Sequence, residues 1–185
     1  MIEDDNYTGD PESATLVISK ATPIINWPNP VEIAYGTPLS SAQLNASAEI
    51  DGSFEYTPEA GTVLEPGDNQ TLSVVFTPVD TANYNAATKE VTINVTRALP
   101  DIAVSSSANP STPGQTVTFT ATVTSNAGTP AGEVIFSDGE TVLDTVTLVE
   151  GQATFTTSDL STGLHAISIE YSGDGYFLAG SSDTL

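Results

Sequence analysis

The stretch TANYNAATKEVTINVTRALP, residues 81–100, has an earlier counterpart in DDNYTGDPESATLVISKATP, residues 4–23. The two stretches align without a gap: Asn6-Tyr7 matches Asn83-Tyr84, and Lys20-Ala21 matches Arg97-Ala98, always 77 positions apart. That spacing is about the length of a small domain. A segment that recurs once per domain length indicates an internal repeat, so the sequence predicts modules joined end to end.

Both copies of this segment alternate between apolar and polar residues. Val91, Ile93 and Val95 share one phase, with Thr92 and Asn94 between them, and the same phase in the first copy holds apolar residues at 14, 16 and 18. Alternation with a period of two is typical of a strand with one buried face. Residues 1–20 are therefore expected to be the last strand of a preceding, truncated repeat.

The chain between and after the two copies divides into further short apolar runs. Turn signals such as Pro28-Asn29-Pro30 and Pro66-Gly67-Asp68 separate these runs, and no stretch has helical spacing. The expected strands are 24–27, 31–35, 44–48, 54–56, 72–76, 91–95, 102–104, 117–123, 133–136, 144–148, 153–156, 165–171 and a last one near 177. This organisation predicts one module over 21–98, a linker over 99–101 and a second module over 102–185.

Short strands separated by Gly and Pro turns are typical of a two-sheet antiparallel sandwich. The predicted fold is therefore all-β, with tandem antiparallel β-sandwiches. In the second module the residues expected to face inward are Phe119, Phe136, Phe155, Ile167, Ile169 and Tyr171.

The charge of the chain limits the partners that it can have. There are 24 acidic and 3 basic residues, which gives a formal net charge of -21. Nucleic acids and anionic lipid surfaces are bound through Lys and Arg, so neither is an expected partner. Repulsion between such polyanionic modules favours a soluble, monomeric and extended chain.

No cysteine is present, which excludes disulfides and thiolate metal sites. No apolar run is long enough to cross a membrane, so membrane insertion is not expected. The first residues, MIEDDNYTGDPE, are acidic where a signal peptide is basic and then apolar. An export signal, if the protein has one, is expected outside this sequence.

Two segments of the first module resemble a known family. They read KATPIINWPNPVEIAYGTPLSSAQLNASA and FEYTPEAGTVLEPGDNQTLSVVFTPVDTANYNAAT, and together they look like a bacterial immunoglobulin-like (Big) repeat. The second module is similar to another class of the same group through GQTVTFTATV, AGEVIFSDG and LSTGLHAISIEYSGDGYF. The resemblance implies tandem immunoglobulin-like antiparallel β-sandwiches in large secreted or wall-anchored proteins, often adhesins or accessory regions beside a catalytic domain. It supplies no catalytic residue.

The side chains needed for catalysis are scarce. His165 is the only histidine, so a catalytic triad or an imidazole zinc site lacks its parts. His165 shares the phase of Ile167 and Ile169 and is expected to start an inward-facing row as a packing residue. Pairs of carboxylates at glycosidase spacing arise by chance among so many acids. We therefore expect a protein that is not an enzyme.

Calcium is the one cofactor that the sequence raises as an option, because this ion is bound by clusters of oxygen ligands. The candidates lie near the expected module joints: Asp4, Asp5, Asp80, Asp101 and Asp174, with Glu3 and Asp10 beside the first two. No segment has the regular spacing of an EF-hand loop. Asp80 and Asp174 have an alternative role, accepting backbone hydrogen bonds in the turn before the last strand.

Aromatic residues recur at similar places in the repeat. Tyr7, Tyr84 and Tyr176 occupy corresponding positions and are expected to be packing anchors at a sandwich corner. Trp27, the only tryptophan, is expected to pack at the module edge, with carbohydrate stacking as the alternative. Lys89 has the phase of Val91 but precedes the strand proper, so it is expected to reach solvent.

Two functions remain open after this reading. The first is a structural spacer or stalk module of a large, exported, repetitive bacterial surface protein, possibly an adhesin, whose partners are the neighbouring Ig-like repeats in the same chain. The alternative is a binding module that recognises a glycan or a host protein through its loops or an exposed sheet. Both place the protein outside the cell, as a secreted or cell-surface protein.

Overall fold

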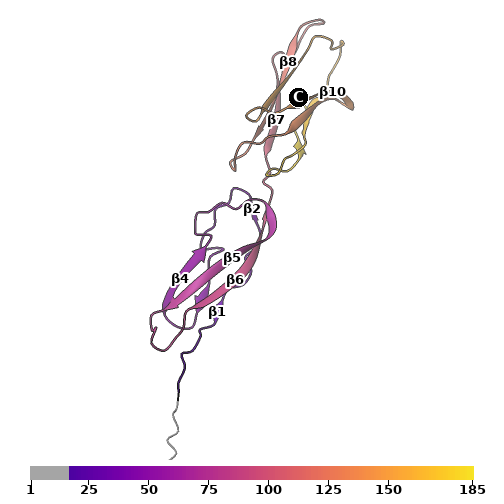
Figure 1. The fold of residues 1–185 in the computed structure, drawn as a ribbon. Coiled ribbons are helices and arrows are strands. Elements are labelled where there is room, and N and C mark those ends of the chain that lie inside the picture. Colours follow the sequence, from indigo (N-terminus) through magenta and orange to yellow (C-terminus); the bar gives the residue numbers. More distant parts are fainter. Residues whose placement is uncertain (1–16) are drawn as a thin grey trace, which may run out of the picture.

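A computed structural model describes residues 17–185 of the chain (Figure 1). Over this range the structure consists of β-strands joined by turns and loops, without a helix. Accordingly, none of the described residues forms a helix that could cross a membrane. The expected strand over residues 1–20 falls almost entirely on residues 1–16, outside the described part.

Residues 17–185 contain thirteen strands. Within this range every segment expected to be a strand contains or touches one, except that the last strand begins after Phe177. Their bounds are β1 Ile25–Asn26, β2 Ile33–Ala34, β3 Ser47–Ala48, β4 Gly52–Thr57, β5 Gly67–Pro78, β6 Ala87–Thr96, β7 Asp101–Ser106, β8 Val117–Thr124, β9 Glu133–Asp138, β10 Thr141–Thr147, β11 Gln152–Thr157, β12 Ile167–Tyr171 and β13 Gly180–Ser181.

The strands form four sheets that enclose two separate clusters of buried side chains. In the first half of the chain a four-stranded sheet, in the order β2-β6-β5-β4, lies with the pair β1-β3. In the second half, the sheet β11-β8-β7 lies with the sheet β10-β9-β12-β13. The structure is therefore all-β and sandwich-like, as predicted. We call the two halves the first and second sandwich.

Alternation along the strands fills the first core. Leu72, Val74 and Phe76 on β5 are at most 1% exposed. They face the same interior as Val91 and Ile93 on β6, so the period-two pattern of the sequence is the pattern of burial. One face of each long strand covers this core.

Trp27 belongs to the centre of the first core and is only 1% exposed. Its ring packs edge-on against Tyr56, with the ring centroids 5.4 Å apart, and its Nε1 donates a hydrogen bond to the carbonyl of Gln43 at 2.9 Å. A buried indole needs such an acceptor. Packing is thus confirmed for Trp27, in the core rather than at the edge of the module. Because the ring is buried, it offers no platform for a sugar.

Lys89 is part of the sheet rather than a residue that precedes it. Its Nζ donates a hydrogen bond to the carbonyl of Ile25 at 3.1 Å, which joins β6 to the short strand β1. The long aliphatic stem allows the side chain to lie along the sheet while the ammonium group finds an acceptor. Lys89 lies within β6 rather than before it, so its expected position was wrong, and its side chain is only partly exposed.

The second core contains the residues expected to face inward. Phe119, Phe136, Ile167, Ile169 and Tyr171 are at most 3% exposed. Phe155 is partly buried, and its ring stacks on that of Phe119. Burial raises the pKa of Tyr171, whose hydroxyl donates to the carbonyl of Ala131 at 2.7 Å. The hydroxyl of this buried tyrosine therefore has a hydrogen-bond partner.

Candidate functional sites: a packed junction and an open cleft

The junction between the two sandwiches starts with Ala98, the residue that follows Arg97 in the repeated segment. Its N–H donates to the carbonyl of Tyr176, and its carbonyl accepts from the N–H of Leu178, both at 2.9 Å. These bonds form a parallel bridge with Phe177, and Ala98 is only 6% exposed within the second core. The chain leaving the first sandwich is therefore fixed to the second before β7 begins.

Tyr35 crosses the junction. It comes directly after β2, where its N–H donates to the carbonyl of Thr96 at 2.8 Å. Its ring lies 4.9 Å from the ring of Tyr176 and 5.9 Å from that of Phe177, and it packs against the core of the second sandwich. Aromatic pairs at these separations stabilise an interface beyond their buried area.

Gly36 allows the two sandwiches to approach each other here. Its φ is +87°, which favours glycine, and a Cβ built at this position would lie 2.4 Å from the Cβ of Ala127. Any larger residue would therefore clash with the second sandwich and strain its own backbone.

Asp174 organises the turn that receives the junction. One carboxylate oxygen accepts from the N–H groups of Tyr176 and Phe177, each at 2.7 Å, and the other accepts from Ala131 at 3.0 Å. Although burial works to raise it, the pKa of Asp174 is held below its usual value by these hydrogen bonds. Arg97 donates to the carbonyl of Asp174 at 3.2 Å, so the turn also binds the incoming linker.

The same arrangement occurs at the other end of the first sandwich. Ala21 forms a parallel bridge with Tyr84, donating to Asn83 and accepting from Asn85, as Ala98 does with Phe177. Lys20 donates to the carbonyl of Thr81 at 2.7 Å, in the manner of Arg97. In each sandwich, the chain that leads into it is thus held by a hydrogen bond from a basic residue, by a bridge at an alanine and by a turn that accepts both.

Asp80 forms that turn in the first sandwich. It accepts from the N–H groups of Ala82 and Asn83, each at 3.1 Å, and from the Asn83 side chain at 2.8 Å. The hydrogen bonds that Asn83 donates lower the pKa of Asp80, and the bond from the Asn83 side chain has the largest effect. The predicted turn role of Asp80 and Asp174 is confirmed by these contacts.

The calcium candidates are not brought together in the described part of the chain. Asp80 and Asp174 direct their carboxylates at backbone donors, and Asp101 is exposed at the start of β7. Between residues 17 and 185, no three His, Cys, Asp or Glu side chains gather in a group that could hold a metal ion. Asp4 and Asp5, with Glu3 and Asp10, lie outside the described residues. Calcium stays a hypothesis.

The expected correspondence between Tyr84 and Tyr176 is wrong by one residue. The bridge matches Tyr84 with Phe177 rather than with Tyr176. Tyr176 is 42% exposed and turns toward Tyr35 and Glu65 of the first sandwich, and the carboxylate of Glu65 raises its pKa. The sequence could not distinguish Tyr176 from Phe177 because the second turn is one residue shorter. Tyr7 falls outside the described residues.

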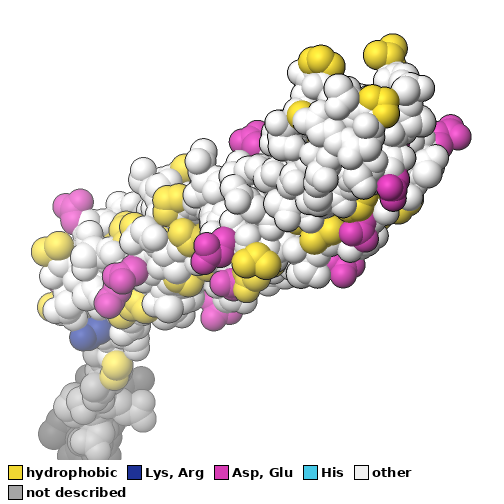
Figure 2. All heavy atoms as spheres, turned by 90° about the horizontal axis from the view of Figure 1, so that it is seen from above, with side chains coloured by type: hydrophobic (Ala, Val, Ile, Leu, Met, Phe, Trp, Pro, Cys, Tyr) yellow, Lys and Arg dark blue, Asp and Glu magenta, His cyan; other side chains and the backbone are white. Residues whose placement is uncertain are grey.

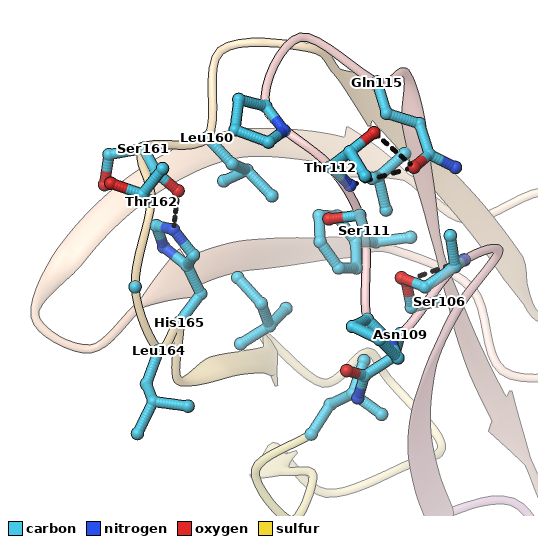
Figure 3. A pocket seen from close by; sticks show the side chains of 18 of the residues that line it. Ser106, Asn109, Ser111, Thr112, Gln115, Leu160, Ser161, Thr162, Leu164 and His165 are labelled. Carbon is cyan, nitrogen blue, oxygen red and sulfur yellow. Dashed lines mark hydrogen bonds between the residues drawn. The ribbon is translucent and has the colours of Figure 1, made fainter.

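A second candidate site is a cleft of about 500 Å³ in the second sandwich. One wall is the segment 106–115, which starts at the last residue of β7, and the other is the segment 160–165 that precedes β12 (Figure 3). Val117, Phe119 and Ile167 reach its apolar floor. The strand β7 begins at the junction and ends at the cleft, so the two candidate sites lie at opposite ends of this strand.

His165 lies at the wall of this cleft rather than in the core, so its expected inward position was wrong. Its Nδ1 is 2.5 Å from a carboxylate oxygen of Asp138, and its Nε2 is 2.9 Å from the carbonyl of Ser161. The hydrogen bond with Asp138, then the contact with Ser161, raises the pKa of His165. The same hydrogen bond lowers the pKa of Asp138. Both ring nitrogens of His165 face acceptors, so the protonated ring can donate two hydrogen bonds and hold the segment 160–165 in place.

Comparison with known protein families gives a match for the second sandwich. A model of the bacterial Ig-like domain, group 3, matches residues 104–185, which include all of its strands except the beginning of β7. No curated protein matches the chain with significance. The resemblance of the first module to the same group stays a prediction. The second sandwich of this chain, residues 104–185, belongs to the bacterial Ig-like domain family, group 3.

Proposed function

We propose that this chain is a structural spacer from a large, exported bacterial surface protein, made of tandem modules over 21–98 and 102–185. The observation that carries the proposal is the packed junction. Tyr35, Gly36 and Ala98 hold the second sandwich on the first through ring contacts, a close backbone approach and a hydrogen-bonded bridge. A stalk needs joints of this kind, because a flexible linker would let the modules fold back on each other.

The arrangement of the two sandwiches supports this role. They lie end to end in Figure 1, with the junction between them and no broad face shared. Each holds the preceding chain through a basic residue, an alanine bridge and an aspartate turn, with Lys20 in the first sandwich and Arg97 in the second. A joint that repeats once per module is what an extended array requires, so neighbouring Ig-like repeats in the same chain are the proposed partners.

The surface charge is also consistent with an extended array. Figure 2 shows Asp and Glu side chains spread along the molecule on this face, with few basic side chains among them. With a net charge of -21, neighbouring modules and neighbouring chains repel each other. We infer an extended, monomeric protein at the cell surface or in the medium, where bacterial Ig-like domains are commonly found.

We propose no catalytic role. The single histidine is bound on both ring nitrogens, to Asp138 and to Ser161, and so has no free nitrogen for general base catalysis in this conformation. Bacterial Ig-like domains are typically structural modules, which agrees with this inference.

Small-angle X-ray scattering on the whole chain tests the spacer. We expect the elongated particle of Figure 1 at physiological and at high salt, because the junction packing is not electrostatic. The Tyr35→Ala variant should give a more compact and heterogeneous particle, and the Tyr35→Phe variant, which keeps the ring, should not. If the unmodified chain already scatters as a flexible pair of domains, the spacer proposal is wrong.

The cleft favours a second candidate function, a binding module. It is concave, it has an apolar floor, and its rim carries polar groups, which are the general features of a ligand site. An adhesin role would require such a site. The cleft is separate from the junction, so the two functions are compatible and can be tested independently.

A further inference from the structure

The first sandwich shows what can occupy the place of the cleft. There, the segment after β2 and the segment before β5 pair with each other. The N–H of Leu39 donates to the carbonyl of Thr62, and the carbonyl of Leu39 accepts from Gly61, both at 2.8 Å. The side chain of Leu39 is 2% exposed and belongs to the core. A leucine held by two backbone hydrogen bonds thus closes the first sandwich.

The corresponding segments of the second sandwich do not meet. Both β5 and β12 pair antiparallel with the last strand of their sandwich, so the segments that precede them correspond. Among the described residues, no hydrogen bond joins 106–115 to 160–165. The space between them is the cleft of about 500 Å³.

A shared turn aligns the two sandwiches at this point. In the first, the side-chain oxygen of Gln43 accepts from the N–H and the hydroxyl of Ser40, each at 3.1 Å. In the second, Gln115 accepts from the N–H and the hydroxyl of Thr112, at 3.0 and 3.3 Å. The backbone N–H of each glutamine also donates to the carbonyl three residues earlier, at 3.0 Å.

The residue before this turn differs between the two sandwiches. It is Leu39 in the first and Ser111 in the second. Ser111 is exposed, its hydroxyl makes no hydrogen bond to the described chain, and it lines the cleft (Figure 3). The cleft therefore exists because the second sandwich lacks the aliphatic side chain that fills the first.

The charge around the cleft limits its occupant. Among the residues that line it, His165 is the only one with an ionisable side chain, and Asp138 neutralises it. No Lys or Arg follows Arg97 in the sequence, whereas acids such as Asp159 and Asp183 are close to the lining residues along the chain. An uncharged segment fits inside the cleft, and basic residues on either side of that segment would be attracted to the acidic surface.

We propose that this cleft binds an extended segment of another protein, which inserts one aliphatic side chain between 106–115 and 160–165, in the place that Leu39 takes in the first sandwich. The segment is uncharged within the cleft and flanked by basic residues. A second copy of this chain is not the occupant, because its own Leu39 is buried and two such polyanions repel each other. This inference goes beyond the spacer, since it does not depend on the junction.

An NMR titration with a defined probe tests the proposal. The probe is an acetylated and amidated hexapeptide with the sequence of residues 36–41, Gly-Thr-Pro-Leu-Ser-Ser, carrying an added lysine at each end. We expect weak, saturable shifts of the backbone amides of Ser111, Leu164 and Ile167. The same peptide with the Leu39→Gly substitution should bind about ten- to a hundredfold more weakly, which is the effect of burying one leucine side chain. Replacing the added lysines with glutamates should also weaken binding.

Two variants of the whole chain complete the experiment. Ser111→Leu should fill the cleft from within, raise the melting temperature and abolish the shifts caused by the peptide. Ser105→Leu, at a position on β7 that is also exposed but does not line the cleft, should leave peptide binding unchanged. Should Ser111→Leu fold poorly, Ser111→Trp offers a second way to occupy the same space.

Three results would overturn the proposal. They are the absence of saturable shifts at these amides, equal binding of the leucine and glycine peptides, and unchanged binding to both cleft-filling variants. Saturable shifts at the same amides with an uncharged oligosaccharide such as cellohexaose, without any with the peptide, would identify the cleft as a glycan site instead. None of these outcomes changes the scattering expected for the spacer, so the two proposals can fail separately.

Discussion

The ring of Tyr35 lies 4.9 Å from the ring of Tyr176, at an interplanar angle of 44°, and connects the end of β2 in the first sandwich to the turn before β13 in the second. Of the junction contacts described above, those of Tyr35 involve side-chain rings from both sandwiches. The others are backbone hydrogen bonds, the contact at Gly36, the bond from Arg97 and the contact between Glu65 and the hydroxyl of Tyr176. Tyr35 is therefore the residue whose removal should loosen the junction while each core stays folded.

The first prediction concerns this ring. Tyr35→Ala should uncouple the tumbling of the two sandwiches, because it removes the contacts with Tyr176 and Phe177. Amide ¹⁵N relaxation should then give a shorter rotational correlation time for each half, whereas the free energy of unfolding of either half should fall by no more than about 1–2 kcal/mol. Tyr35→Phe is the control and should tumble as the unmodified chain does. Unchanged relaxation in the alanine variant would show that the ring does not hold the junction.

Gly36 gives a second prediction about the junction. Gly36→Ala places a methyl group 2.4 Å from the Cβ of Ala127 and keeps a φ of +87°, which L residues rarely adopt. We expect the sandwiches to separate or tilt and the melting temperature to drop. Gly61→Ala is a matched control, because Gly61 has a φ of +89° but a Cβ there would meet nothing within 4 Å. Equal losses in the two variants would mean that backbone strain alone, and not the contact with Ala127, explains the effect.

The third prediction concerns Asp174. Asp174→Ala leaves the N–H groups of Ala131, Tyr176 and Phe177 without their acceptor. The second sandwich should lose about 1–2 kcal/mol of unfolding free energy, since the carboxylate is partly exposed to solvent and its hydrogen bonds are screened. Because its pKa is lowered by folding, the stabilisation is present above the unfolded pKa near 3.8 and is lost as the pH falls through the lower folded value. Urea unfolding of the unmodified chain and of Asp174→Ala, at pH 7 and below pH 3, checks this prediction. If the substitution lowers the unfolding free energy as much below pH 3 as at pH 7, the prediction is wrong.

His165 and Asp138 give a pH prediction of opposite sign. The pKa of His165 is raised by its hydrogen bond with Asp138, so the stabilisation is full below the unfolded pKa near 6.5 and is lost as the pH rises through the higher folded value. Asp138, with its lowered pKa, contributes above about 3.8 and loses its contribution in acid. The pair should therefore be strongest between roughly pH 4 and 6.5.

The pH dependence can be measured directly. Titration of the His165 ring by NMR should give a pKa above 6.5, and His165→Gln should remove the difference in urea midpoint of the second sandwich between pH 6 and pH 8.5. Around this pair, Ala166 donates its N–H to Asp138, and the ring also meets the Ser161 carbonyl, but neither of these groups titrates in this range. A ring pKa at or below 6.5 would show that the hydrogen bond does not persist in solution.

The fifth prediction addresses calcium. Asp80 and Asp174 accept hydrogen bonds from backbone N–H groups, and within residues 17–185 neither belongs to a group of three His, Cys, Asp or Glu side chains that could hold a metal ion. The melting temperature should therefore be the same in millimolar calcium and in a chelator. A rise of several degrees with calcium would revive the metal hypothesis, and a repeat of the measurement with Asp4→Asn and Asp5→Asn would show whether the first acidic segment is responsible.

The sequence was sufficient to predict the features that depend on local patterns. The alternation of Val91, Ile93 and Val95 is determined by the pleat of a strand, so it predicts burial without knowledge of the partner strands. The turn role of Asp80 and Asp174 follows from the tendency of aspartate to accept nearby backbone hydrogen bonds. These predictions needed only neighbours along the chain.

The features that define the candidate sites depend on distant residues and could not be read from local patterns. Tyr35 was expected to be an ordinary strand residue, and only the bridge between Ala98 and Phe177 brings the second sandwich onto its ring. The cleft depends on the small side chain of Ser111, whose significance appears only when it is compared in space with Leu39. His165 does not belong to the inward-facing row that was predicted, because β12 begins at Ile167 and His165 lies before the strand.

The distance between the two sandwiches in solution is the most direct test of the spacer. The chain has no cysteine, so spin labels can be placed at one exposed position on each sandwich through Glu55→Cys and Thr154→Cys, and their separation measured by pulsed electron paramagnetic resonance. A packed junction predicts one narrow distance distribution that broadens when Tyr35→Ala is added. A broad distribution in the labelled chain that already contains Tyr35 would contradict a stiff joint.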